Sequence, residues 1–249
     1  MQVEKEKKFY EVLDEFQKSI YDRIYDGILQ RKSVIIFGNP KLQTERNFMD
    51  KILFLLLADY PEIFNVDFEN TTYVFSRNAI IMGISYVFSE KEQKSFEWRV
   101  ARKVATLTEN IKTYCGNDKK QQIRYLYDYF VANISYATDE LKSENRRILC
   151  RIHSVLGSLL DGKAVCDGIA RGFKLFLDEL GIDNWVIRQE LKKGMAFSHE
   201  WNVVMLGGEV WHFDITWEID LYNLSKQTLF RYYMLSEKEM RMRHEERIC

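Results

Sequence analysis

The first part of the chain alternates hydrophobic and polar residues in patterns that predict helices and short strands. Hydrophobic residues recur every three or four positions and predict an amphipathic helix over about residues 4–30, with the stripe Phe9, Val12, Leu13, Phe16, Ile20, Ile24 and Ile28. The β-branched run 33–37 predicts a strand that ends at the Gly38-Asn39-Pro40 turn. We expect a second helix over about 43–59, before Pro61, and two further strands near 71–76 and 80–88.

The pattern becomes mainly helical in the next part of the chain. A charged helix is predicted over about 92–114, and the Gly116-Asn117-Asp118 turn leads into another helix with the stripe Ile123, Leu126, Tyr127, Phe130 and Ile134. Near the other end, Ser236-x-x-Glu239 has the form of a capping box and predicts the start of a helix. We therefore expect an N-terminal α+β region (1–115), a core (116–224) and a C-terminal helical tail (225–249).

Cys166 is predicted to lie in the first turn of a buried helix. The loop around Gly162 passes at Cys166 into a helix that stops at Gly181, with the apolar stripe Ile169, Phe173, Phe176, Leu177 and Leu180. A helix N-terminus carries partial positive charge, which favours a thiolate over a thiol. At about 100° per residue, Cys166 projects about 60° from Ile169, beside the buried stripe. The small residues Gly168, Ala170 and Gly172 would let another layer approach closely. Taken alone, a cysteine in an apolar helix is more often a packing residue.

A hairpin is predicted after residue 198. Residues 199–206 and 209–217 read as two strands, and Gly207-Gly208 between them is a strong signal for a two-residue loop. With that loop, Leu206 pairs with Glu209, and the same register places Trp201 opposite Asp214 and His199 opposite Thr216.

That register brings His199 and Asp214 onto one face as diagonal neighbours. Their Cβ atoms would lie about 7–8 Å apart, close enough for the two side chains to form a hydrogen bond. A nucleophilic enzyme needs an imidazole that takes and returns a proton, and a carboxylate that orients it. We therefore predict a catalytic triad of Cys166, His199 and Asp214. His212 lies on the same face, and we interpret it as structural.

The three segments resemble the motifs of a known superfamily. Gly162-Lys163-Ala164-Val165-Cys166-Asp167-Gly168, Ser198-His199-Glu200-Trp201-Asn202 and His212-Phe213-Asp214-Ile215-Thr216-Trp217 are similar, in this order, to those of the transglutaminase-like superfamily, which is related to papain-like cysteine hydrolases. The resemblance covers about residues 118–240 and is to bacterial members. It implies an α+β fold in which the Cys166 helix packs on an antiparallel sheet. Trp201 and Trp217, inside these motifs, are supporting site residues.

The resemblance also implies an activity. It implies acyl transfer through a thioester, which either cleaves an amide or peptide bond or passes the acyl group to an amine. The implied substrate is a protein or peptide, and no cofactor is implied. Bacterial members often have a small residue where this chain has Glu200. Because Glu200 alternates to the face opposite His199, we expect it to alter the rim more than the chemistry.

An oxyanion hole combines a backbone N–H with a second donor, and each donor is worth about 2.7–4 kcal/mol of barrier. The backbone N–H of Cys166 is a natural first donor. No Gln or Asn lies between Arg151 and Val165, where a papain-like enzyme keeps its side-chain donor. This leaves His153 and Ser154 as the candidates.

Two other functions fit the same residues. The chain could be a catalytically silent transglutaminase-like module that binds or organises a partner. Alternatively, Cys166, His199, His212 and Asp214 are all acceptable zinc ligands, although only His212 and Asp214 are close in sequence. The expectation from the triad is an enzyme without a metal.

Charge and composition exclude several classes of protein. The 36 Lys and Arg residues nearly balance 37 Asp and Glu residues, which argues against nucleic acid as a partner. The longest apolar run, 52–58, is far shorter than the roughly 20 residues that cross a membrane. The charged N-terminus lacks the apolar core of a secretory signal, and the four cysteines include no C-x-x-C pair. We expect a cytoplasmic protein with free thiols.

Overall fold

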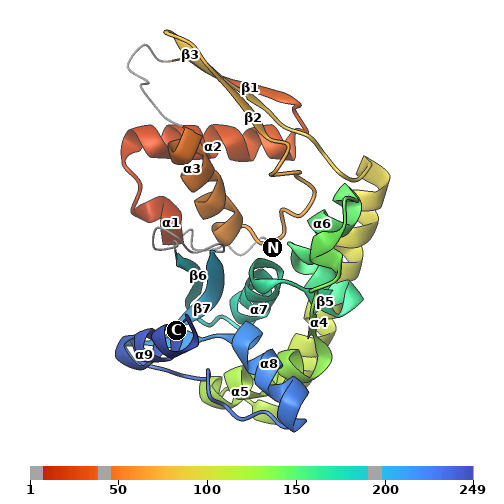
Figure 1. Cartoon of the computed structure of the whole chain (residues 1–249), viewed down its shortest axis with the longest axis vertical. Coiled ribbons are helices and arrows are strands. Elements are labelled where there is room, and N and C mark those ends of the chain that lie inside the picture. The colour runs from red at the N-terminus through yellow and green to blue at the C-terminus, as the bar shows by residue number, and fades with distance from the viewer. Residues whose placement is uncertain (1–7, 39–45, 190–197, 249) are drawn as a thin grey trace. The chain divides into compact units, whose positions relative to one another are not determined.

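The computed structural model describes residues 8–38, 46–189 and 198–248. The chain divides into two compact units, Met1–Gln93 and Lys94–Cys249, which Figure 1 shows in a continuous colour ramp. The division expected near Gly116 and Ser225 stays a prediction. Residues 4–7 and 43–45, which begin two of the predicted helices, lie outside the described residues.

The first unit packs helices on one face of an antiparallel sheet. Its strands β1 (Val34–Gly38), β2 (Thr72–Phe75) and β3 (Ala79–Gly83) form a sheet in the order β1-β3-β2. Helices α1 (Lys8–Glu11), α2 (Glu15–Leu29) and α3 (Arg46–Asp59) supply most of the remaining core, and α2 and α3 lie beside the sheet in Figure 1. The opposite face is exposed and apolar, with Ile81 between Ile36 and Val74.

The helix predicted over 4–30 is interrupted. Asp14 begins α2 as its N-cap, accepting a hydrogen bond from the Gln17 N–H while the Gln17 side chain accepts one from the Asp14 N–H. This capping box ends the first helical segment at Glu11 and leaves Val12 78% exposed, outside the stripe to which its spacing assigned it. Ile20, Ile24 and Ile28 are buried as predicted.

Two long helices match the predicted ones, and the first of them starts shortly before Lys94, where the second unit begins. They are α4 (Glu90–Cys115) and α5 (Lys119–Asn133), and α5 is capped by Asp118. Shorter elements follow: β4 (Ser135–Tyr136), a 3-10 turn at Glu140–Lys142, α6 (Arg146–Ile152), a π-helical turn at Gly157–Asp161 and β5 (Lys163–Ala164). The two-residue strands β4 and β5 pair in parallel, so Tyr136 lies opposite Ala164, just before Cys166.

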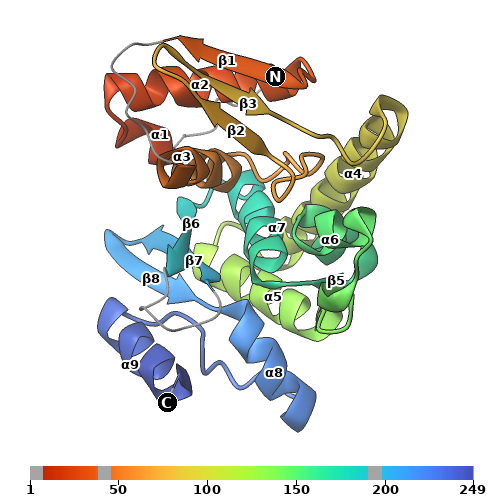
Figure 2. The ribbon, with the colours of Figure 1, turned by 45° about the horizontal axis from the view of Figure 1, so that its top comes forward.

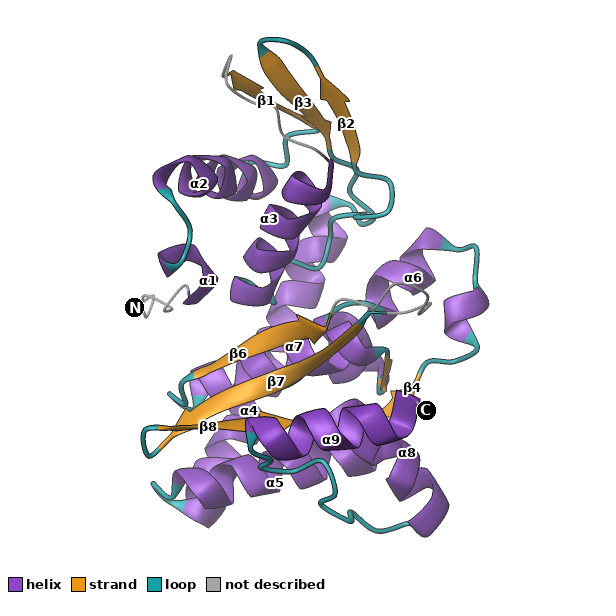
Figure 3. Ribbon diagram, turned by 60° about the vertical axis from the view of Figure 1, so that its left-hand side comes forward, coloured by secondary structure: helices purple, strands orange, loops and turns teal. Residues whose placement is uncertain are grey.

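A three-stranded antiparallel sheet forms the centre of this unit. Its strands β6 (Asn184–Gln189), β7 (His199–Leu206) and β8 (Glu209–Phe213) are arranged in that order. Helix α7 (Cys166–Glu179) packs on one face, and α9 (Glu237–Ile248) lies on the other, as Figures 2 and 3 show. The fold is therefore α+β, with the cysteine-bearing helix on an antiparallel sheet.

The predicted hairpin register is confirmed from Leu206 to Asn202, but the predicted pairs Trp201–Asp214 and His199–Thr216 are wrong, because Thr216 lies in a helix. Leu206 pairs with Glu209 and Asn202 with Phe213, and both loop glycines have positive φ angles of 65° and 81°. The second strand, however, was predicted to continue to Trp217, and this was wrong. It ends at Phe213, and α8 (Ile215–Ser225) begins directly after Asp214.

Helix α7 is held against its neighbours at very short range. A Cβ on Gly168 would collide with the carbonyl oxygen of Ile152, so only glycine fits where the helix passes α6. Ser158 donates to the Gly168 carbonyl (2.7 Å), and Asn202 of β7 donates to the Ala170 carbonyl (2.8 Å). These contacts fix the helix end that carries Cys166 relative to the strand that carries His199.

In the described part of the chain, no helix has the length and apolar character needed to cross a membrane.

Candidate active site

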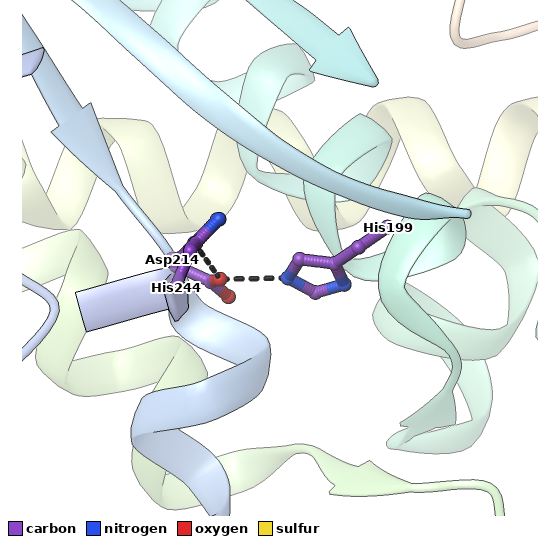
Figure 4. A group of neighbouring side chains, drawn as sticks. All are labelled: His199, Asp214 and His244. Carbon is purple, nitrogen blue, oxygen red and sulfur yellow. Dashed lines mark hydrogen bonds and ion pairs between the residues drawn. The ribbon is translucent and has the colours of Figure 1, made fainter. Parts of the chain in front are cut away.

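The three residues predicted as a triad meet in the second unit. Cys166 is the first residue of α7 and is partly exposed, His199 is the first residue of β7, and Asp214 is the N-cap of α8. The Nε2 atom of His199 lies 2.6 Å from Oδ2 of Asp214 (Figure 4). This leaves Nδ1 as the ring nitrogen available to Cys166, whose side chain also interacts with His199.

The route by which Asp214 reaches His199 differs from the predicted one. Asp214 does not pair across the hairpin with Trp201. Its backbone N–H donates to the Tyr232 carbonyl (3.0 Å), and its Oδ1 atom accepts from the Trp217 N–H (3.1 Å). Capping α8 in this way leaves Oδ2 for His199.

A buried glutamate holds the loop that anchors Asp214. Glu218 has no exposed surface and accepts hydrogen bonds from the N–H groups of Leu229 (2.7 Å) and Tyr232 (2.9 Å). The hydroxyl of Tyr127 on α5 donates to the same carboxylate (3.3 Å). The position of Asp214 thus depends on the carboxylate of Glu218, which lies about one turn further along α8.

Burial and charge act against each other at the His199–Asp214 pair. Burial lowers the pKa of His199, but the charge of Asp214, the hydrogen bond to it and the neighbouring Cys166 raise that pKa from 6.5 to about 10. Burial raises the pKa of Asp214, and the charges and contacts of His199 and His244 hold it well below its usual range. Each partner therefore favours the charged form of the other, a cationic imidazole and an anionic carboxylate.

Two tryptophans from the motifs enclose the histidine. The ring of Trp217 stacks on His199 at a centroid distance of 4.7 Å and an interplanar angle of 7°, and Trp201 lies 5.7 Å away. The indole N–H of Trp201 donates to His212 Nδ1 (3.0 Å), while His212 Nε2 faces Glu237 (2.9 Å). His212 therefore lies behind Trp201 and outside the His199–Asp214 contact, in agreement with its structural interpretation.

The two residues predicted as candidate oxyanion-hole donors, His153 and Ser154, interact with other groups. His153 Nδ1 lies 2.9 Å from Asp167, and the Ser154 hydroxyl donates to the Arg151 carbonyl (3.1 Å). A different polar residue, Tyr136, lies opposite Ala164, two residues before Cys166. Burial raises the pKa of the Tyr136 hydroxyl, and the charge of Cys166 raises it further. The sequence reasoning missed Tyr136, although its place in the short strand paired with residues 163–164 follows from the fold.

Glu200 does not lie on a rim. It is on the face of β7 opposite His199, as predicted, but that face is covered, and Glu200 is only 2% exposed. Its carboxylate pairs with Arg188 of β6 (2.6 Å) and Arg171 of α7 (3.5 Å). Glu200 therefore ties the sheet to the cysteine-bearing helix, and its expected effect on the rim was wrong.

A second histidine, His244 of α9, completes the surroundings of Asp214 and was missed from sequence. Its Nε2 atom lies 3.3 Å from Oδ2 of Asp214, and it is 3% exposed (Figure 4). The only signal was its spacing four residues after Met240, which is also buried.

His199, Asp214 and His244 are also the residues that could hold a metal. Among the described residues they form a group whose ligand atoms all lie within 4.8 Å of one another, and His212 is not part of it. Tetrahedral zinc ligands lie about 3.3 Å apart, as follows from metal–ligand distances of about 2.0–2.1 Å. The 2.6 Å separation of His199 and Asp214 is that of a hydrogen bond, so a metal would have to push these two groups apart.

No family model matches the chain, and no curated protein matches it. Two solved structures are similar. One, described as a TGase, has 11% identity and a TM-score of 0.39, covering 74% of this chain and 50% of the other. The second, described as "a Putative Cysteine Protease from Cytophaga hutchinsonii", has 13% identity and a TM-score of 0.34, covering 56% of this chain and 51% of the other. The chain spans about half the length of each of these two structures.

Proposed function

We propose that this chain is a transglutaminase-like cysteine enzyme that acts on amide or peptide bonds through a thioester. The observation that carries the proposal is the meeting of Cys166, His199 and Asp214, with a 2.6 Å bond from the imidazole to a buried carboxylate. The three motifs that resemble the superfamily supply these same residues. An imidazolium beside a sulfur at a helix N-terminus favours the nucleophilic thiolate.

In the proposed reaction, Cys166, His199 and Asp214 act both in forming the thioester and in breaking it down. The Cys166 sulfur attacks the carbonyl carbon, and the carbonyl π electrons move to oxygen. His199 then gives its proton to the leaving amine as the carbon–nitrogen bond breaks, which leaves a thioester. In the second half, His199 takes a proton from water or from an amine, that acceptor attacks the thioester, and the Cys166 thiolate leaves. Asp214 keeps the imidazole oriented and balances its charge throughout.

The developing oxyanion needs two donors. The backbone N–H of Cys166 lies in the first turn of α7, where amide hydrogens have no partner within the helix. We propose the Tyr136 hydroxyl as the second donor, because the pairing of β4 with β5 sets Tyr136 opposite Ala164, two residues before Cys166, and a protonated phenol is a hydrogen-bond donor. A hydroxyl donor removes the need for a Gln or Asn between Arg151 and Val165, where the sequence has none.

Mass spectrometry tests the function directly. The native chain is incubated with glutamine-containing peptides and a small primary amine, and compared with Cys166→Ala. Peptide cleavage or deamidation selects hydrolysis, and incorporation of the amine selects transamidation. A covalent acyl adduct on Cys166 is expected in either case, and products that persist unchanged with Cys166→Ala would refute the proposal.

Alkylation distinguishes an enzyme from a silent binding module of the same fold. A catalytic Cys166 should react with iodoacetamide near neutral pH much faster than Cys115 and Cys150, which provide internal controls. Burial raises the pKa of Cys115, so that thiol should be slow. Similar rates at all three cysteines would favour the binding module.

A further inference from the structure

His244 lies between two groups that flank the proposed base. Its Nε2 atom is 3.3 Å from Asp214 Oδ2, and its Nδ1 atom is 3.2 Å from the side-chain oxygen of Gln189. Gln189 is the residue directly opposite His199 in the register of β6 and β7. One imidazole from α9 therefore connects the strand neighbour of His199 to the carboxylate that binds His199.

The ring of His244 is tightly enclosed. It packs edge-on against Trp217 (4.1 Å between centroids) and Trp201 (4.4 Å), the two rings that also contact His199. The same helix contributes Met240 to a cluster with Trp201, Tyr232 and Leu235. A ring held in this way has little freedom to turn, so the direction of its Nε2 atom toward Asp214 is set by packing.

Asp214 needs such a partner for a physical reason. The carboxylate has no exposed surface, and a buried charge is costly unless its oxygens accept hydrogen bonds. Oδ1 accepts from the Trp217 N–H, whereas Oδ2 is bonded to His199 and lies 3.3 Å from Nε2 of His244. During the proposed reaction His199 gives up its Nδ1 proton and with it its positive charge, while its Nε2–H stays on Oδ2. His244 is a second imidazole beside the same buried oxygen.

We propose that His244 is a positioning residue, which holds the Asp214 carboxylate through the close contact of its Nε2 atom with Oδ2 and so keeps His199 aligned with Cys166. This rests on the proposed function. Helix α9 then belongs to the active site instead of merely covering the sheet. The residues that complete the site come from a part of the chain outside all three motifs.

Two isosteric substitutions separate positioning from packing. The amide nitrogen of a glutamine reaches the place of His Nε2, whereas that of an asparagine reaches the place of Nδ1. His244→Gln therefore keeps a donor toward Asp214, and His244→Asn keeps one only toward Gln189. Each is prepared in the full chain, with His244→Ala and the native protein, and thermal unfolding confirms that each variant folds.

The first readout is the rate at which iodoacetamide modifies Cys166 at neutral pH. We expect His244→Asn and His244→Ala to slow it by about 10- to 100-fold, the usual cost of losing a group that orients a functional residue through another. His244→Gln should stay closer to native than to His244→Ala. Equal rates in the Gln and Asn variants would overturn the proposal.

The second readout does not depend on activity. The hydrogen-bonded proton between His199 and Asp214 is expected at low field in the proton NMR spectrum, and it should persist in His244→Gln and broaden or shift in His244→Asn. A signal unchanged in every variant would overturn the proposal. If Cys166 in the native protein reacts no faster than Cys115, the proposed function fails, and the NMR comparison still decides the role of His244.

Discussion

His199 contacts Asp214 through a 2.6 Å hydrogen bond to a carboxylate that has no exposed surface. The bond joins the first residue of β7 to the cap of α8, so it depends on the end of the hairpin as much as on the hairpin itself. A charged pair in such a place is strong only while both partners are present, because the loss of one leaves the other buried and uncompensated.

Asp214→Asn should keep the shape of the site and remove its charge. We expect the acyl-transfer rate to fall by about 10³- to 10⁴-fold, since the neutral amide can no longer favour the cationic, correctly oriented imidazole. Glu209→Gln, an exposed change in the same hairpin, is the control. Rates are measured with whichever peptide the mass spectrometry identifies, and a loss of less than about tenfold would contradict the assigned role.

The His199–Asp214 pair should make stability depend on pH in a defined direction. The folded pKa of His199, about 10, is above its ordinary value of about 6.5. The contribution of His199 to the free energy of unfolding is therefore fully present below about pH 6.5 and is lost as the pH rises toward 10. Urea unfolding of the native chain and of His199→Gln between these values should show the difference in free energy of unfolding shrinking as the pH rises. A constant difference would contradict the assignment.

Loss of Glu200 should destabilise the second unit more than loss of its exposed partner. Glu200→Ala leaves Arg171, itself 5% exposed, without its buried counter-charge, at an expected cost of about 3–5 kcal/mol in the free energy of unfolding. Arg188→Ala is the matched control, because Arg188 keeps 35% of its side chain exposed and should cost about 1 kcal/mol. Urea titration measures both, and an equal loss in the two variants would argue against a buried network.

Tyr136→Phe should reduce turnover without preventing alkylation of Cys166. Removal of one oxyanion donor costs about 2.7–4 kcal/mol of barrier, a loss of about 10²- to 10³-fold in rate. Alkylation passes through no oxyanion, so the rate with iodoacetamide should stay near that of the native chain. If both rates fall together, Tyr136 shapes the site without acting as the donor.

Features with strong local signals could be predicted from the sequence. Gly207-Gly208 fixes the hairpin because both residues adopt positive φ, and every strand pair of β7 and β8 follows from that loop. The start of α7 at Cys166 could also be predicted, from the loop around Gly162 before it and the apolar stripe after it. The first two motifs were therefore placed on the correct helix and strand, whereas only the start of the third lies on its predicted strand.

The remaining features depend on contacts that local patterns do not contain. Ile215, Thr216 and Trp217 favour strands by type, yet they form the first turn of α8 because Asp214 caps it and Tyr232 holds the Asp214 N–H. His244 shows no local sign of its role, since its partners Gln189 and Asp214 belong to β6 and to the end of the hairpin. Tertiary contacts therefore determine both the end of β8 and the position of His244.

The parallel contact between His199 and Trp217 has an optical consequence. A cationic imidazole lying flat on an indole accepts electron density from the excited ring and quenches its emission, whereas the neutral imidazole does so weakly. Trp217 is thus placed to report, by its fluorescence, each change in the protonation of the residue that it covers. The chain thus carries an internal indicator of the protonation of His199, which can be followed in the absence of any substrate.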